Sequence, residues 1–186
     1  KPSGTVSQLV DSASGIHPRH SRYYIRRIRG DKKDPLTTFM MEQGIPSEDC
    51  VMRPESTAIF SFPKKAPHNA LLREDLTAVQ HLDLWMMYQK HWCEHKPSVT
   101  ISVNEDEWVE VGAWVWKNFD DVSGVSFLPY DGGTYKQAPY EECSEEEYKE
   151  LLHKMPQEID WDSLIEVDDN VEGAQQLACT AGACEI

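Results

Sequence analysis

The chain has 186 residues, of which 40% are hydrophobic and 10% aromatic, and its formal net charge at pH 7 is −14. This length and composition suit a domain with a packed core and exclude a wholly disordered chain. Residues 141–172 contain thirteen Asp or Glu and two Lys, so most of the negative charge belongs to an acidic tail. Without a sustained basic face, the chain is not expected to bind nucleic acid. No run of 18 apolar residues and no signal peptide is present, so we expect no membrane span and a cytoplasmic protein.

The chain opens on a turn that can begin a helix. Residues 2–5 (PSGT) combine a proline that cannot continue a strand ladder, a glycine that allows close approach of the backbone, and two hydroxyl residues that can cap a helix. Apolar residues at positions 6, 9 and 10 follow at helical spacing. A helix start of this kind can bind phosphate through its free N–H groups. An ordinary helix N-cap is the simpler interpretation of the local sequence.

An arginine-rich strand follows this turn. Residues 22–29 read RYYIRRIR, which alternates as a strand with mixed faces. Residues 1–33 carry eight Lys or Arg and two Asp, although the chain as a whole is acidic. The sequence therefore places a cationic strand near the candidate anion site.

Helices and strands then alternate, with short links, to about residue 155. This order predicts an α/β architecture of parallel strands joined by crossover helices. The four strands are too few to close a barrel, so we expect them to complete a larger sheet. Helices are predicted from Pro35 to a stop at Gly44, from a cap at Asp75 to His95, after an Asn104–Glu107 capping box and after a Ser144–Glu147 capping box; the strands are residues 22–29, 56–62, 98–103 and 125–130.

The end of the chain has a different character. Residues 159–176 are acidic and without periodicity, which predicts a flexible linker. Cys179 and Cys184 then form a C-x4-C pair separated by small residues. Such a dithiol on a flexible arm can deliver electrons by thiol–disulfide exchange. The alternative interpretation is that the two cysteines are incidental and have no redox role. Cys50, Cys93 and Cys143 are scattered, and the seven histidines form no ligand set, so we predict no metal site.

Taken together, several motifs resemble the late part of class II, adenosylcobalamin-dependent ribonucleotide reductases, best the ribonucleoside-triphosphate type. The residues that carry the resemblance read KPSGTVSQL, SGIHPR, YYIRRIR, SVTISV and SGVSFLPYDGGTYKQAPYEE. The resemblance implies the C-terminal part of a ten-stranded α/β barrel over residues 1–155, and a flexible acidic linker with a redox arm over residues 156–186.

The resemblance also implies roles for particular residues. Substrate phosphates would be bound by Ser3, Gly4, Thr5, Val6 and Ser7. The pair formed by Cys179 and Cys184 would reduce the active-site disulfide after each turnover and be recharged by thioredoxin. Implied partners are the N-terminal remainder of the reductase, a ribonucleoside triphosphate substrate and, in the complete enzyme, adenosylcobalamin.

Two absences refine this expectation. Class I relatives need a Tyr-Tyr pair in a late barrel strand, and residues 126–129 here read SFLP, which fits a radical generated locally by adenosylcobalamin. The motif around the radical cysteine of the family is not found, so we expect the chain to be a fragment that does not reduce nucleotides alone. The alternatives are a non-enzymatic phosphate-binding α/β module with an acidic interaction tail, and a stand-alone dithiol reductase, for which the usual C-x-x-C motif is missing.

Overall fold

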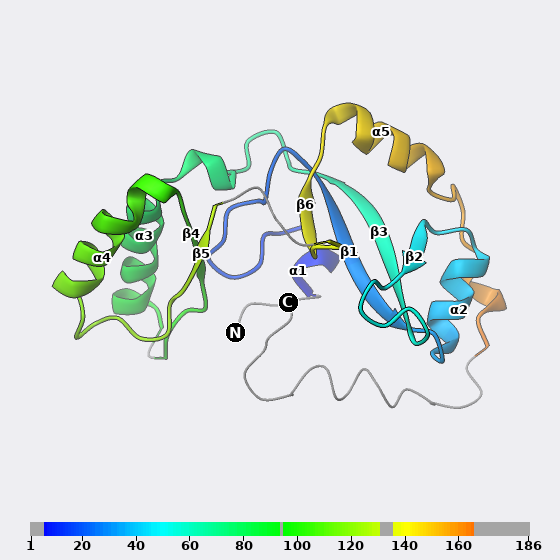
Figure 1. Cartoon of the computed structure of the whole chain (residues 1–186), viewed down its shortest axis with the longest axis horizontal. Helices are drawn as coiled ribbons and strands as arrows, with labels where there is room; N and C mark the ends of the chain where they lie inside the picture. The colour runs from blue at the N-terminus through cyan, green and yellow to red at the C-terminus, as the bar shows by residue number, and fades with distance from the viewer. Residues whose placement is uncertain (1–5, 94, 131–135, 166–186) are drawn as a thin grey trace. The chain divides into compact units, whose positions relative to one another are not determined.

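The computed structural model describes residues 6–93, 95–130 and 136–165 (Figure 1). The chain divides into two compact units. Unit 1 holds the described residues of 1–22 and 66–134, and unit 2 holds those of 23–65 and 135–186. Both units combine helices with strands, so the predicted mixed α/β class is confirmed. The two sheets described below do not by themselves make a ten-stranded barrel.

Unit 1 contains the parallel arrangement that the sequence predicts. Strands β4 (Thr100–Val103) and β5 (Ser126–Pro129) pair in parallel. The connection between them passes through the 3-10 helix η2 (Glu105–Glu107) and helix α4 (Trp108–Lys117). A parallel pair requires such a crossover, because the chain must return to the same end of the sheet. Helix α3 (Ala78–His91) contacts both β4 and α4 (Figure 1).

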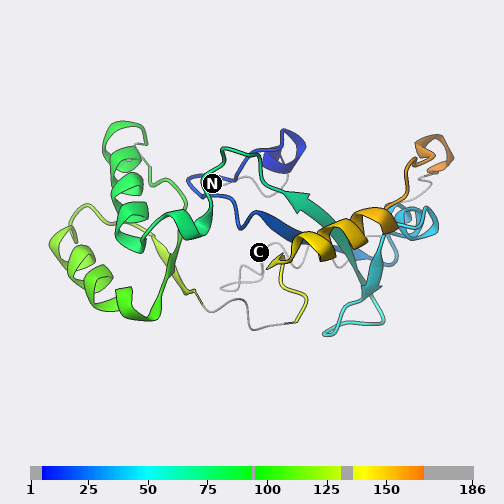
Figure 2. The ribbon, with the colours of Figure 1, turned by 90° about the horizontal axis from the view of Figure 1, so that it is seen from above.

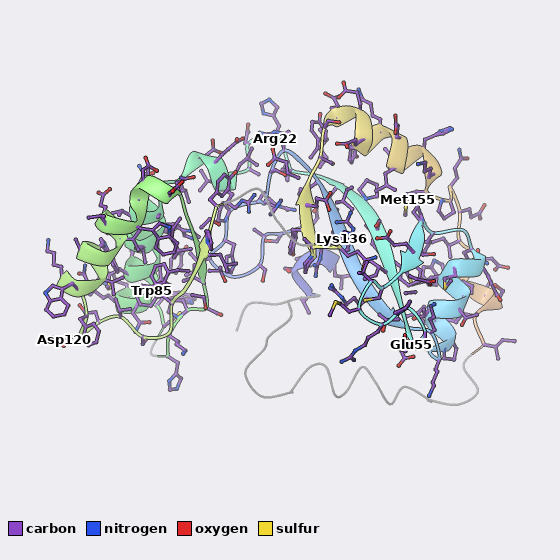
Figure 3. The ribbon with its side chains drawn as sticks, in the orientation of Figure 1. Arg22, Glu55, Trp85, Asp120, Lys136 and Met155 are labelled. Atoms are coloured by element: carbon purple, nitrogen blue, oxygen red, sulfur yellow. The ribbon has the colours of Figure 1, made fainter. Side chains whose placement is uncertain are left out.

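The core of unit 1 lies between these helices and the two strands. Trp85, labelled in Figure 3, is fully buried, and its indole N–H donates to the Pro97 carbonyl at 2.8 Å. That bond satisfies the single polar group of a large side chain that would otherwise be costly to bury. The buried residues of this core are Ala78, Leu82, Trp85, Met86, Val99, Ile101, Val103 and Val111.

Unit 2 is built on an antiparallel sheet, contrary to the prediction of parallel strands. Its strands are β1 (Tyr23–Asp31), β2 (Ser47–Asp49), β3 (Thr57–Lys65) and β6 (Tyr140–Glu142). Among the described residues their order is β2-β3-β1-β6, and every neighbouring pair is antiparallel. Strands β2 and β6 are not predicted from the sequence; each is three residues long, exposed or half-buried, and rich in acidic residues. Such segments lack the apolar alternation that marks a strand.

Helices α2 (Pro35–Glu42) and α5 (Glu145–Lys154) complete unit 2. Asp34 caps α2, and Gly44 takes a φ of +79° just beyond its end, as the predicted stop requires. The predicted capping box at Ser144 is confirmed, since its hydroxyl accepts from the Glu147 N–H at 3.1 Å. Helix α5 contacts both β3 and β1 (Figure 2).

Two predicted boundaries in unit 1 are wrong. Helix α3 begins after Thr77, whose side chain accepts from the Gln80 N–H, and it ends at His91 rather than His95. Asp75 instead closes the 3-10 helix η1 (Arg73–Asp75) by accepting from the Leu72 N–H at 2.7 Å. The predicted box at Asn104 is confirmed and lies at η2.

The first part of the predicted tail contacts unit 2. Met155 and Ile159 pack against a cluster of Ile45, Ala58 and Phe60 (Figure 3). In the 3-10 helix η3 (Trp161–Ser163), the Trp161 ring lies 5.4 Å from that of Phe39. The linker predicted for residues 159–176 is therefore in contact with the sheet over its first residues. In the part of the chain that the structure describes, no helix is long and apolar enough to cross a lipid bilayer.

Candidate functional site in unit 1

The candidate site begins at helix α1 (Val6–Leu9), a single turn. Val6 and Ser7 are the two predicted phosphate-binding residues within the described chain; Ser3, Gly4 and Thr5 lie outside it. The Val6 side chain is exposed and Ser7 is buried. The chain closes behind them, because the Val10 N–H donates to the Val6 carbonyl at 3.2 Å and the Ser12 N–H donates to that of Ser7 at 2.8 Å.

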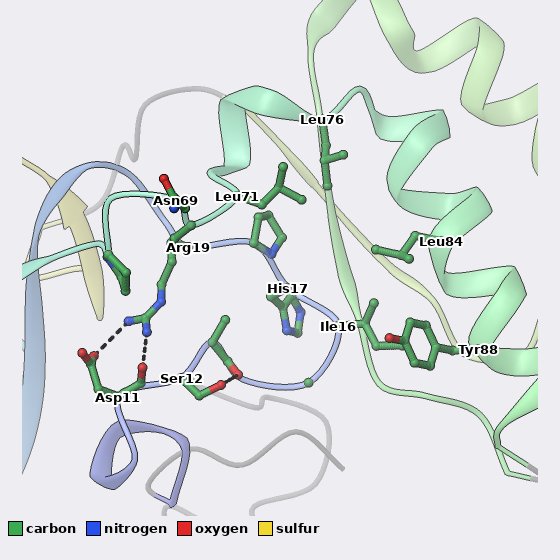
Figure 4. Close-up of a pocket in the computed structure, with 15 residues that line it drawn as sticks. Asp11, Ser12, Ile16, His17, Arg19, Asn69, Leu71, Leu76, Leu84 and Tyr88 are labelled. Carbon is green, nitrogen blue, oxygen red and sulfur yellow. Dashed lines mark hydrogen bonds and ion pairs between the residues drawn. The ribbon is translucent and has the colours of Figure 1, made fainter.

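A loop of residues 11–19 follows α1 and is closed by an ion pair. Asp11 takes a positive φ of 47°, which costs a non-glycine residue about 1 kcal/mol, and Gly15 takes one of 56°. The guanidinium of Arg19 is almost fully buried and binds the Asp11 carboxylate at 3.2 Å (Figure 4). It also donates to the main-chain carbonyl of Asp11. The two ends of the loop are thus joined directly.

His17 attaches the same loop to strand β4. Its Nδ1 lies 2.5 Å from the Ser14 carbonyl oxygen, and its Nε2 lies 2.9 Å from the Thr100 backbone nitrogen. A carbonyl can only accept and a backbone N–H can only donate, so these partners assign the proton to Nδ1 and the lone pair to Nε2. His17 is therefore neutral in this arrangement.

Two further histidines of unit 1 are held in their neutral form. His81 on α3 is buried and its Nε2 lies 2.6 Å from the Ile16 carbonyl. Burial lowers the pKa of His81, and the hydrogen bond to Ile16 opposes this shift. Burial and then the nearby Arg73 charge lower the pKa of His20 from 6.5 to about 4.

The loop of residues 11–19 lines a pocket of about 630 Å³ together with residues between 67 and 88 (Figure 4). One part of its wall is polar and includes Asp11, His17 and Arg19. Another part is apolar and includes Leu71 and Leu84. A pocket with an apolar wall and a few polar groups can hold a small organic molecule. The sequence motifs predict no role for these residues, since SGIHPR contributes only to the family resemblance.

The arginines of the arginine-rich strand contact a later segment of unit 2. Arg26 stacks 4.4 Å from the centre of the Tyr140 ring. Arg27 pairs with Glu141, and Arg29 donates to the Gln137 carbonyl at 3.3 Å. These guanidinium groups hold residues 137–141 against β1. The positive charges of the strand thus contact carbonyl groups, a carboxylate and an aromatic ring, and the prediction that they lie near an anion site stays a prediction.

Comparison with known proteins gives one consistent answer over the whole chain. No family model matches. An adenosylcobalamin-dependent ribonucleoside-triphosphate reductase of Euglena gracilis is 32% identical over 99% of this chain, which corresponds to 26% of that protein. The enzyme of the same name from Lactobacillus gasseri is 30% identical over 100% of the chain and 26% of its own length.

The chain matches a segment of adenosylcobalamin-dependent ribonucleoside-triphosphate reductases. The resemblance predicted from the sequence motifs is confirmed. The fold agrees, because the crystal structure of a B12-dependent, class II ribonucleotide reductase superposes with a TM-score of 0.69 and 28% identity. That match covers 86% of this chain and 23% of the solved one. The chain thus spans about a quarter of the length of these reductases.

Side chains that could ligate a free metal ion are dispersed in the described part of this chain. Those residues contain no group of three or more His, Cys, Asp or Glu that could hold a metal ion. His91 and His95, four apart in sequence, are not on one helix, because α3 ends at His91.

The three cysteines of the described chain form no disulfide with one another. Cys50 is buried, and Cys50, Cys93 and Cys143 are all free thiols. Burial and then the neighbouring Glu147, Glu141 and Glu142 raise the pKa of the Cys143 thiol. A thiol held protonated is a poor nucleophile for exchange. The predicted redox pair, Cys179 and Cys184, lies outside the described residues.

Proposed function

We propose that this chain works as part of an adenosylcobalamin-dependent ribonucleoside-triphosphate reductase, which converts ribonucleotides to 2′-deoxyribonucleotides. The observation that carries the proposal is the identity of 32% to the Euglena gracilis reductase along 99% of the chain. We place the chain in the C-terminal part of a ten-stranded α/β barrel of that enzyme. The parallel β4–β5 pair supports this placement, since two parallel strands need further strands for stability.

Within that enzyme, residues 3–7 would bind the substrate phosphates. Ser3, Gly4, Thr5, Val6 and Ser7 would act through backbone N–H groups and hydroxyls, which suit phosphate oxygens. The backbone hydrogen bonds that Val6 and Ser7 accept from Val10 and Ser12 support this role, because a rigid segment loses little entropy when it binds a ligand. The ligand in this proposal is a ribonucleoside triphosphate.

Cys179 and Cys184 would carry electrons to the active site. Removal of the substrate 2′-hydroxyl as water consumes two electrons, which come from a pair of cysteine thiols that becomes a disulfide. A thiolate of the arm then attacks this disulfide, and the second arm thiol resolves the mixed disulfide, so the pair is reduced and the arm is oxidised. Thioredoxin would reduce the arm in turn. The cofactor supplies the radical when bound.

The proposed partners are the remainder of the reductase and thioredoxin, in the cytoplasm. The test uses the complete reductase that contains this segment, assayed with a ribonucleoside triphosphate, adenosylcobalamin and either thioredoxin or a small dithiol. We expect Cys179→Ser and Cys184→Ser each to stop after about one turnover with thioredoxin and to continue with the small dithiol. Cys93→Ser, a matched change at a free thiol, should turn over normally with both reductants.

Two results would count against the proposal. If the complete reductase does not produce deoxyribonucleotides under these conditions, the assigned reaction is wrong. If it does, and both arm variants turn over normally with thioredoxin, the reaction stands and the electron-carrying role of the arm is wrong.

A further inference from the structure

The loop of residues 11–19 is fastened to the rest of unit 1 by bonds that come from different elements. The Ile16 carbonyl contacts His81 on α3, and the Arg19 N–H donates to the Leu71 carbonyl at 2.8 Å. The Arg19 side chain joins the loop end to Asp11, where φ is positive. A backbone conformation that is unfavourable by itself persists only when surrounding contacts determine it.

His17 differs from these other contacts because it bonds in two directions at once. One ring nitrogen donates within the loop, to Ser14, and the other accepts from Thr100, the first residue of β4. The side chain thus connects the middle of the loop to the strand. Only the neutral imidazole with its proton on Nδ1 can make both bonds.

The loop leads directly back to the described part of the proposed phosphate-binding segment. The Ser12 N–H, one residue after Asp11, donates to the Ser7 carbonyl. A shift of the loop away from β4 would therefore be passed to Ser7 through one backbone hydrogen bond and four residues of chain. Ser7 itself is buried, so little room is available for it to adjust independently.

We propose that His17 is a positioning residue of the reductase. Its Nδ1–H imidazole fixes the loop to β4 and thereby holds Val6 and Ser7 in the geometry that binds the triphosphate of the substrate. His17 does not contact the phosphates in this proposal. The effect of His17 on triphosphate binding rests on the proposed phosphate-binding role. The attachment of the loop to β4 by His17 does not depend on that role.

Two substitutions separate the bonds of His17 from its volume. In His17→Gln the amide oxygen can accept from Thr100 while the amide nitrogen donates to Ser14, so both bonds can be kept. His17→Leu keeps an apolar side chain of moderate size and removes both bonds. His68→Gln is the matched control, because His68 is an exposed histidine of the same unit that bonds only to its neighbour Asn69.

The first experiment tests the loop directly by NMR on the 186-residue chain. We expect imidazole ¹⁵N shifts of a protonated Nδ1 and an unprotonated Nε2 at His17. Exchange of the Thr100 amide hydrogen should accelerate about tenfold in His17→Leu and remain close to wild type in His17→Gln and His68→Gln. A proton on Nε2, or an unchanged Thr100 exchange rate in folded His17→Leu, would overturn the proposal.

The second experiment tests the link to phosphate binding in two assays. Calorimetry measures the affinity for inorganic tripolyphosphate, and steady-state kinetics of the complete reductase with a ribonucleoside triphosphate measure KM and kcat. His17→Leu should weaken tripolyphosphate binding about tenfold and raise KM with little change in kcat, and His17→Gln should restore most of both. Equal affinity and KM in wild type and His17→Leu would overturn the positioning role. If the wild-type protein does not bind tripolyphosphate, the proposed phosphate-binding role of the segment is wrong. The NMR result would still test whether His17 attaches the loop to β4.

Discussion

The two units of the chain are stabilised in different ways. Unit 1 has a core of eight buried apolar residues between two helices and a parallel strand pair. The cluster in unit 2 has three buried residues, Ile45, Ala58 and Phe60, with four partly buried neighbours. Further buried apolar residues of unit 2, Tyr24 and Ile59, lie on the long ladder between β1 and β3, which pairs Tyr23 with Lys65 at one end and Asp31 with Thr57 at the other.

The two units also differ in how far apart in the sequence the residues that stabilise them lie. In unit 1, apolar residues at helical spacing on α3 and α4 pack against alternate residues of β4, so a short window of sequence contains the relevant pattern. In unit 2, the arginines of β1 are stabilised by residues 137–141, more than 100 positions later. Contacts of that kind leave no periodic signal near the strand itself.

Replacement of Trp85 should have the largest effect on stability, and it should destabilise unit 1 without destabilising unit 2. Trp85→Ala removes a fully buried indole from unit 1 and leaves the Pro97 carbonyl without its donor. We expect a loss of about 4 kcal/mol in the free energy of unfolding. Hydrogen exchange should accelerate across α3, α4 and β4 and remain slow in β1 and β3.

The matched control is Trp116→Ala, since the Trp116 side chain is 82% exposed on α4. Its free energy of unfolding should change by no more than about 0.5 kcal/mol. Equal acceleration of exchange in both units by Trp85→Ala would contradict the division of the chain into two separately stabilised parts.

Acid should destabilise unit 1 through His20. The folded-state pKa of about 4 lies below the ordinary 6.5, so the folded state disfavours the charged form. The contribution of neutral His20 to stability is therefore complete above pH 6.5 and is lost as the pH falls toward 4. The loss is about 3 kcal/mol at pH 4, from the linkage between proton binding and folding.

Urea denaturation between pH 4 and 7 measures this contribution. His20→Gln cannot be protonated, so its stability relative to wild type should rise by about 2–3 kcal/mol as the pH is lowered from 7 to 4. His68→Gln, at an exposed histidine of unit 1, should follow the wild-type pH profile. Parallel profiles for wild type and His20→Gln would show that this side chain is not held neutral by burial.

The sequence predicted the mixed α/β class, the β4–α4–β5 crossover and the capping box at Ser144 because each depends on residues close together in the chain. It did not predict the antiparallel sheet of unit 2. Strand β2 has no apolar residue, and β6 pairs with a strand more than 100 residues earlier, so neither pairing is visible locally. The bond between His17 and Thr100 in the candidate site joins residues 83 positions apart, so it is not visible locally either.

A smaller effect should come from Gly30, which is closely packed against α2 and β3. A Cβ added at Gly30 in β1 would meet the Thr37 hydroxyl on α2 and lie 3.1 Å from the Phe60 ring. We expect Gly30→Ala to cost about 2 kcal/mol through overpacking. Thr37→Ala removes the side-chain atoms that the new methyl group meets, so in the double variant Gly30→Ala should cost about 1 kcal/mol less than it does alone. If the changes in the free energy of unfolding are strictly additive in this cycle, α2 moves away from β1 freely. Amide hydrogen exchange in unit 1 should remain unchanged in all three variants, because the altered contacts lie within unit 2.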